Sequence, residues 1–192
     1  MEQKDVIAFF NRCAPTWDEE MVRKEDVIQT ILDHAGIRPG IDVLDVACGT
    51  GVLFPDYFAR GVRTVTGIDI APEMAKRARE KYPQAQVVCG DAETYPFGRR
   101  FDAVMVYNAF PHFPDPRRAV EAFASLTGPG GRLSIAHGMS RADLARHHSG
   151  AASRVSVELP DEQTLAAMLS PWFDVDVAVS NGRMYQVAGT RR

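Results

Sequence analysis

The chain has 192 residues, of which 45% are apolar and 24% are charged, as in one ordinary soluble domain. The 25 acidic side chains outnumber the 22 basic ones, and the formal net charge is -3. Because phosphate backbones are bound by basic surfaces, we expect no nucleic-acid partner. The odd number of cysteines (Cys13, Cys48 and Cys89) in a chain of this size favours a reducing, cytoplasmic setting. The charged start and the lack of a long apolar run predict neither an export signal nor a membrane span.

Residues 1–39 predict a helical cap ahead of the main fold. Apolar residues recur at helical spacing as far as Leu32, and Pro15 interrupts the pattern. No repeat or long linker divides the chain, so we expect one domain over residues 1–192, with its core in residues 40–192.

From residue 40 onward, apolar runs alternate with amphipathic stretches. Strands with nearly continuous apolar residues are typical of a parallel sheet that helices cover on both faces. We therefore predict an α/β fold, a Rossmann-like doubly wound sandwich. The expected strands are 42–47, 64–70, 86–89, 101–107 and 132–137, and the expected helices are 52–60, 72–82 and 116–126.

The last third follows another pattern. A helix is expected over residues 161–170, followed by strands over 173–179 and 184–190. Asn181 and Gly182 lie between these strands, and both tolerate positive φ, which indicates a tight antiparallel hairpin at the edge of the sheet. The prediction is a mostly parallel, seven-stranded mixed sheet.

The segment Val-Leu-Asp-Val-Ala-Cys-Gly-Thr-Gly, residues 43–51, carries the strongest functional signal. An apolar strand runs into a turn of small residues, where glycines let the backbone pass close to a ligand. Open α/β sheets bind ligands beyond the carboxyl ends of their parallel strands. The alternative is a glycine turn without a ligand.

Two acidic residues end the next predicted strands. Asp69 follows Gly51 by eighteen residues, where a carboxylate can accept hydrogen bonds from a ribose diol, and Asp91 ends the third strand. Asp69 could instead cap the following helix. Matching chemistry at three strand ends favours a binding site.

Together these residues resemble the class I S-adenosylmethionine-dependent methyltransferases. The resemblance is closest to the small-molecule branch that includes the ubiquinone and menaquinone biosynthesis C-methyltransferases. It covers about residues 40–140, including the motif at 101–113 and the L-x-P-G-G-x-L-like turn at 126–133. Ala47 stands where many members have the first glycine of the turn. The resemblance implies methyl transfer from S-adenosyl-L-methionine to a small-molecule acceptor, with S-adenosyl-L-homocysteine as the product.

The resemblance also implies roles for individual residues. The cofactor-binding set comprises Asp45, Ala47, Cys48, Gly49 and Gly51 at the methionine part, Asp69 at the ribose, Ile70, Met74, Asp91 and Ala92 around the adenine, and Asn108 in the loop after the fourth strand. Trp17 and Asp18 match a segment that closes over the cofactor. Phe110 and Phe113 would suit a planar or apolar acceptor, although core packing is the alternative for aromatic residues.

Other functional classes are less consistent with the residues. An NAD fingerprint needs glycine or alanine three positions after Gly51, where this chain has Phe54. Asn108 does not open the Asn-Pro-Pro-aromatic motif of enzymes that methylate amino groups in nucleic acids. Cys48 and Cys89 lack the clustered spacing of a metalloid site. A non-catalytic cofactor-binding or scaffolding domain stays open as the alternative, and both monomer and homodimer are possible.

The histidines are the candidate bases for proton transfer. His112 lies in the loop expected to face the substrate, and His137 ends the fifth strand. The neighbours His147 and His148 are not spaced for a shared metal, so we predict no metal, although three histidines within twelve positions leave that alternative open.

Overall fold

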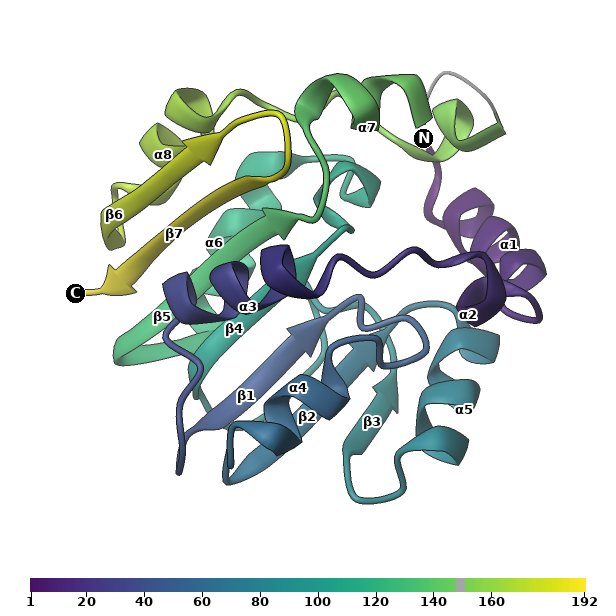
Figure 1. Ribbon diagram of the computed structural model, residues 1–192, viewed down its shortest axis with the longest axis horizontal. Coiled ribbons are helices and arrows are strands. Elements are labelled where there is room, and N and C mark those ends of the chain that lie inside the picture. Colours follow the sequence, from purple (N-terminus) through teal and green to yellow (C-terminus); the bar gives the residue numbers. More distant parts are fainter. Residues whose placement is uncertain (148–150) are drawn as a thin grey trace.

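The computed structural model describes residues 1–147 and 151–192 and is built around one seven-stranded sheet (Figure 1). The strand order is β3-β2-β1-β4-β5-β7-β6. The first five strands are parallel, and β7 runs antiparallel to both β5 and β6. The predicted mixed sheet is therefore confirmed. The strands are β1 (Asp42–Val46), β2 (Thr64–Asp69), β3 (Gln86–Cys89), β4 (Phe101–Tyr107), β5 (Thr127–His137), β6 (Phe173–Ser180) and β7 (Tyr185–Arg191).

Helices cover both faces of the sheet. They are α1 (Gln3–Cys13), α2 (Trp17–Glu20), α3 (Glu25–His34), α4 (Phe54–Ala59), α5 (Pro72–Lys81), α6 (Pro116–Leu126), α7 (Arg141–His147) and α8 (Glu162–Leu169), with short 3₁₀ helices η1 (Phe110–His112) and η2 (Ala151–Val155). Alternate residues of β4 enter two core clusters, Val104 with α6 and α8, and Met105 with α3 and α4. The sheet is thus the middle layer of a sandwich. Within the described residues, no helix is both long and apolar enough to span a membrane.

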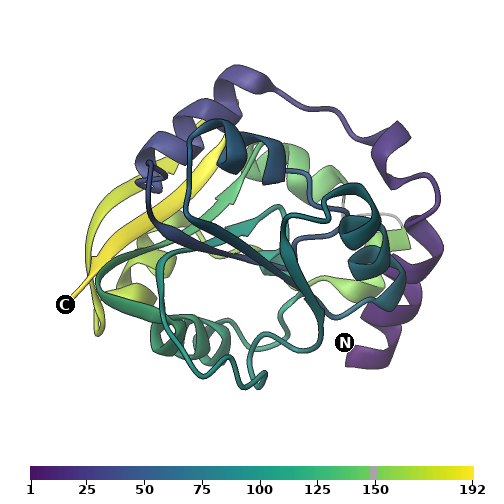
Figure 2. The same cartoon turned by 90° about the horizontal axis from the view of Figure 1, so that it is seen from below.

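The predicted N-terminal cap divides into two parts. Helix α3 packs into the core and is fixed there by Gln186, whose side-chain amide donates to the carbonyl of Ile31 and to Ser134 Oγ, both at 3.0 Å. Helices α1 and α2 lie beyond the sheet, on the side away from the C-terminus (Figures 1 and 2). Val6 is the one fully buried residue of α1 and α2 has none, while Phe10, Cys13 and Trp17 are partly buried against a small cluster that includes Met74 of α5.

The hairpin between β6 and β7 forms as expected, but through a different turn. Neither Asn181 nor Gly182 has a positive φ. The Asn181 side-chain oxygen instead accepts the backbone N–H groups of Arg183 (2.8 Å) and Met184 (3.0 Å). Asparagine therefore makes this turn through its side chain.

Strand β1 contains a buried carboxyl group. Asp45 is 2% exposed and accepts a hydrogen bond from the Tyr57 hydroxyl at 3.2 Å. Burial raises the pKa of Asp45 to about 8, with a smaller contribution from the negative charge of Asp69, and the Tyr57 hydrogen bond opposes this rise. The folded protein thus holds this proton over a pH range in which the unfolded chain, with a pKa of about 3.9, has lost it.

This difference predicts a pH-dependent effect of Asp45→Asn. Because the folded state binds the extra proton, the wild type loses stability as the pH rises from about 4 to about 8, whereas the neutral amide does not titrate. The melting temperature of the variant minus that of the wild type should rise by several degrees across this range, as measured by calorimetry. Glu121→Gln, on the exposed face of α6, is the control. A difference that stays constant or falls as the pH rises would contradict the prediction.

Candidate functional site

A cavity of about 410 Å³ lies at the carboxyl ends of β1, β2 and β4, beside the turn that follows β3, and α1 and α2 cover it. Its volume is in the range typical of small-molecule pockets. Of the residues predicted for the site, those that line the cavity are Trp17, Ala47, Cys48, Gly49, Asp69, Ile70, Met74, Asp91, Ala92, Asn108, His112 and Phe113. The structure thus brings together residues from five separate segments of the chain, 17, 47–49, 69–74, 91–92 and 108–113.

The glycine turn after β1 forms the floor of the cavity. Ala47, Gly49 and Gly51 all have positive φ, at 53°, 56° and 83°. Gly49 faces the cover, because a Cβ built there would lie 3.6 Å from Trp17 Nε1. Gly51 does not line the cavity, and a Cβ on it would lie 2.8 Å from the ring of Phe54. Gly51 is therefore required for close packing beneath the turn.

Asp69 joins the glycine turn to the start of α5. Its two carboxylate oxygens accept the backbone N–H groups of Gly49 and Ala71, each at 2.8 Å. Asp69 is not the N-cap of α5, since Ala71 holds that position. Burial raises the pKa of Asp69 to about 6, against the effect of the two backbone hydrogen bonds. The carboxylate is thus partly protonated in mildly acidic solution.

Asp91 lines the cavity in the turn that follows β3, where the N–H of Gly90 donates to the carbonyl of Asp69 at 2.9 Å. One of its oxygens accepts from the side-chain amide of Gln3 in α1 at 2.9 Å, and the other accepts the N–H of Glu93 at 2.9 Å. Sequence reasoning did not identify Gln3, which is 88 residues away along the chain. Asp91 thereby connects the cover to the sheet.

The predicted cover residues lie across the glycine turn. Asp18 accepts from Thr50 Oγ1 at 2.5 Å and from Lys81 Nζ at 2.7 Å. The ring of Trp17 contacts Phe10 edge-on, with centroids 5.7 Å apart. The cover is therefore attached to both the turn and α5.

Asn108 shapes the loop after β4. Its φ is 55°, and its side-chain oxygen accepts the N–H of Gly138 at 2.9 Å, while its own N–H donates to the carbonyl of Ala136 at 2.9 Å. Asparagine adopts this left-handed conformation more readily than most residues. These bonds hold the loop on the end of β5, so that Asn108 borders the cavity.

The two candidate bases lie in different environments. His112 lines the cavity, its ring centroid is 4.9 Å from that of Phe10, and its Nδ1 is 2.8 Å from the carbonyl oxygen of Val155. Because a carbonyl oxygen only accepts, Nδ1 carries the proton. His137 is fully buried, with its ring 6.1 Å from that of Tyr185, and it does not line the cavity. The geometry thus gives no support to a proton-transfer role for His137.

Two residues predicted for the site, Asp45 and Phe110, lie in the protein core and not in the cavity. Asp45 does not line the cavity, because its carboxyl is buried against Tyr57. Phe110 is 1% exposed and packs in the core cluster on the α6 face of the sheet, as the alternative interpretation allowed. His148 lies outside the described residues. Among the residues that the structure does describe, no three His, Cys, Asp or Glu side chains are grouped to hold a metal ion.

Cavity residues that sequence reasoning did not assign to the site include Gln3, Met21, Val52 and Glu93. Tyr107, which lies within the motif at 101–113, also lines the cavity. Gln3, Met21, Val52 and Glu93 belong to none of the motifs named above, and the N-terminal segment brings Gln3 and Met21 to the cavity.

Comparisons with known proteins agree with this geometry. A family model described as "Methyltransferase domain" matches residues 44–135. Among curated proteins, a demethylmenaquinone methyltransferase of Renibacterium salmoninarum is 31% identical over 138 residues, and a ubiquinone biosynthesis O-methyltransferase of Xanthomonas campestris pv. campestris is 39% identical over 113 residues. These matches cover 69% and 54% of this chain, and they span only 58% and 47% of the relatives' lengths.

Solved structures share the fold. The N-methyltransferase NodS of Bradyrhizobium japonicum, in complex with S-adenosyl-l-homocysteine, superposes with a TM-score of 0.77 at 15% identity, covering 97% of this chain and 98% of that one. Magnesium protoporphyrin IX methyltransferase of Synechocystis gives a TM-score of 0.76 at 18% identity, with full coverage of both chains. The chain therefore carries a methyltransferase domain at residues 44–135, on the fold that these solved methyltransferases share.

Proposed function

We propose that the protein transfers a methyl group from S-adenosylmethionine to a small-molecule acceptor. The observation that carries this proposal is the cavity that joins the glycine turn, Asp69 and Asp91 under one cover. The similarity to a demethylmenaquinone methyltransferase and to a ubiquinone biosynthesis O-methyltransferase supports the proposal.

The residues present fit this cofactor. A carboxylate has about four acceptor positions, and the two backbone N–H groups at Asp69 occupy only two of them, so a ribose diol can still donate to it. Ile70 and Met74 supply apolar walls, and Asp91 can accept from an amino group. When bound, the cofactor supplies an electrophilic methyl group on a sulfonium. The chain itself then has to align the acceptor and exclude water.

The remaining cavity residues fit a planar or apolar acceptor. Phe10, Trp17, Met21, Tyr107 and Phe113 line it with aromatic and thioether groups. Because His112 lines the cavity and its Nδ1 lies 2.8 Å from the Val155 carbonyl oxygen, which fixes the ring, we assign His112 as the base for an acceptor that carries a proton.

The alternatives make different predictions. The NAD hypothesis conflicts with Phe54, which fills the space between α4 and β2: a Cβ on Gly67 would lie 2.6 Å from its ring. A non-catalytic binding domain differs from an enzyme in turnover with every acceptor tested. Our proposal includes a cytoplasmic protein that acts on no nucleic acid, as a monomer or homodimer, and sedimentation of the purified protein distinguishes these two states.

The first prediction of the proposed function concerns the cofactor. In calorimetric titrations, S-adenosylmethionine and S-adenosylhomocysteine should bind and NADH should not. Asp69→Ala should weaken binding of both by roughly tenfold or more, since hydrogen bonds to a charged group are lost. Asp174→Ala, on the exposed edge strand, is the control. Binding of NADH alone, or of none of the three, would refute the proposed function.

The second prediction concerns the cover. Deletion of residues 1–20, or Asp18→Ala alone, should weaken S-adenosylhomocysteine binding, because the contacts with Thr50 and Lys81 are lost. For Asp18→Ala we expect a loss of about threefold to tenfold, as these groups are partly exposed. Asp33→Ala removes an ion pair away from the cavity and is the control. Unchanged affinity in both variants would contradict a role for the cover.

The third prediction concerns His112. Once an acceptor that must lose a proton is found by screening, His112→Gln should lower kcat by about a hundredfold or more, while the Kd of S-adenosylhomocysteine changes little. His137→Gln is the comparison, measured beside a thermal unfolding curve. Equal kcat in the wild type and the His112 variant would rule out general-base catalysis by this residue.

A further inference from the structure

The segment between α2 and α3 is extended and contributes Met21 to the cavity. Met21 has φ -78° and ψ 125°, and Lys24 has φ -109° and ψ 92°. Successive side chains of an extended chain point to opposite sides. Met21 accordingly lines the cavity, Val22 is 83% exposed, and Arg23 turns back into the protein with 29% of its side chain exposed.

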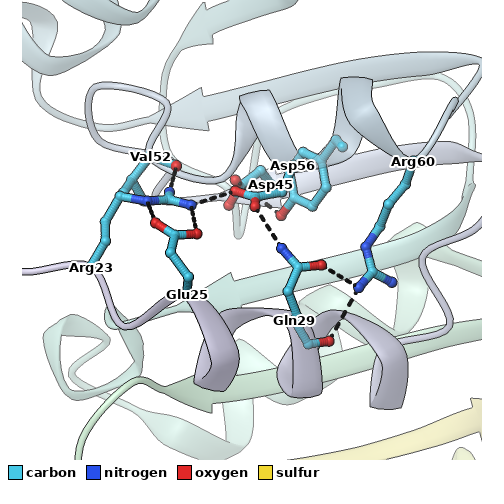
Figure 3. Close-up of polar contacts among 8 residues, drawn as sticks. Arg23, Glu25, Gln29, Asp45, Val52, Asp56 and Arg60 are labelled. Carbon is cyan, nitrogen blue, oxygen red and sulfur yellow. Dashed lines mark hydrogen bonds and ion pairs between the residues drawn. The ribbon is translucent and has the colours of Figure 1, made fainter.

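Arg23 connects three elements, as Figure 3 shows. Its Nη1 donates to the carbonyl of Val52, just after the glycine turn. Its Nη2 donates to Asp56 in the first turn of α4 at 2.9 Å, and its Nε to Glu25 at the start of α3 at 2.7 Å. A guanidinium can make these bonds at once because its donors lie in a fixed planar fork.

The partners of Arg23 are themselves held in place. Asp56 is 8% exposed, and its other carboxylate oxygen accepts from the side-chain amide of Gln29 at 3.0 Å (Figure 3). Removing the Arg23 guanidinium would leave a buried carboxylate with one fewer donor at the N-terminus of α4. Since α4 directly follows the glycine turn, the loss of this hydrogen bond would also destabilise the conformation of the turn.

The extended segment is therefore hydrogen-bonded at both ends to the loop that follows β1, residues 47–53. Asp18 binds Thr50, and Arg23 binds Val52, two residues further along the loop. Met21 lies between the two attachment points and enters the cavity, as does Val52. Arg23, which does not line the cavity, thus links the segment that carries Met21 to the loop that carries Val52.

We propose that Arg23 is a positioning residue for methyl transfer, which holds Met21 and Val52 beside the glycine turn in the arrangement that binds the cofactor product. This inference rests on the proposed function, because it assigns Arg23 to that same site. Arg23 acts through Val52 and Asp56 and does not touch the ligand.

The test compares Arg23→Met and Arg23→Lys with Arg60→Met. Arg60 belongs to the same polar network, but its partners Gln29, Ile37 and Asp33 do not line the cavity. For each protein we would measure the Kd of S-adenosylhomocysteine, the melting temperature, and acrylamide quenching of Trp17 fluorescence in a Trp172→Phe background.

We expect Arg23→Met to weaken S-adenosylhomocysteine binding about tenfold and to increase quenching of Trp17 in the bound state. Arg23→Lys should recover part of the affinity, since its ammonium can replace one of the bonds. Arg60→Met should leave the Kd within about twofold, whatever its effect on melting temperature.

Each other outcome decides the question. If the wild type binds and both Arg23 variants bind equally well, the positioning role is refuted while the proposed function stands. If Arg60→Met weakens binding as much as Arg23→Met, the network is only structural, and the inference also fails. If the wild type does not bind the nucleoside, the proposed function falls and the inference falls with it. Should Arg23→Met not fold, Arg23→Lys decides by the same criteria.

Discussion

The carboxylate of Asp69 joins the two backbone segments on which the cavity depends. It is 7% exposed at the end of β2 and accepts one N–H from the glycine turn and one from the start of α5. A buried carboxylate is costly without donors, and a tight turn needs an acceptor for its N–H groups, so each stabilises the other. These two hydrogen bonds fix the glycine turn and the start of α5 relative to each other at the ends of β1 and β2.

The cover depends on that turn but is held in another way. Helices α1 and α2 pack on the start of α5 through a small apolar cluster that includes Phe10, Trp17 and Met74, and polar pairs such as Gln3 with Asp91 add to this attachment. This cluster is far smaller than the two clusters that flank the sheet, and partly exposed polar contacts are each worth little, so the cover is held less strongly than the sheet. Helix α3, with four buried apolar residues and the Gln186 contacts, is the fixed point from which the cover extends.

Sequence reasoning identified what local patterns encode. Every expected strand formed, because apolar runs and turn residues are local signals, and the strand ends correctly located Asp69 and Asp91. It missed the contacts of Gln3 and Arg23, since polar contacts between distant segments leave no periodic trace. It placed His137 at a strand end but could not show that the side chain faces Tyr185, which depends on the register of β5 with β7.

The departure at Ala47 and the residue Phe54 show why two similar-looking glycine turns differ. Ala47 at φ 53° costs about 1–2 kcal/mol, while glycine there would cost about 0.5–1 kcal/mol of backbone entropy, so the two nearly balance. No such balance exists at Gly51, where a side chain would collide with the ring of Phe54. A dinucleotide turn needs that space open for its helix to approach the strand. The packing of Phe54 therefore separates the two cofactor classes, whereas the first glycine does not.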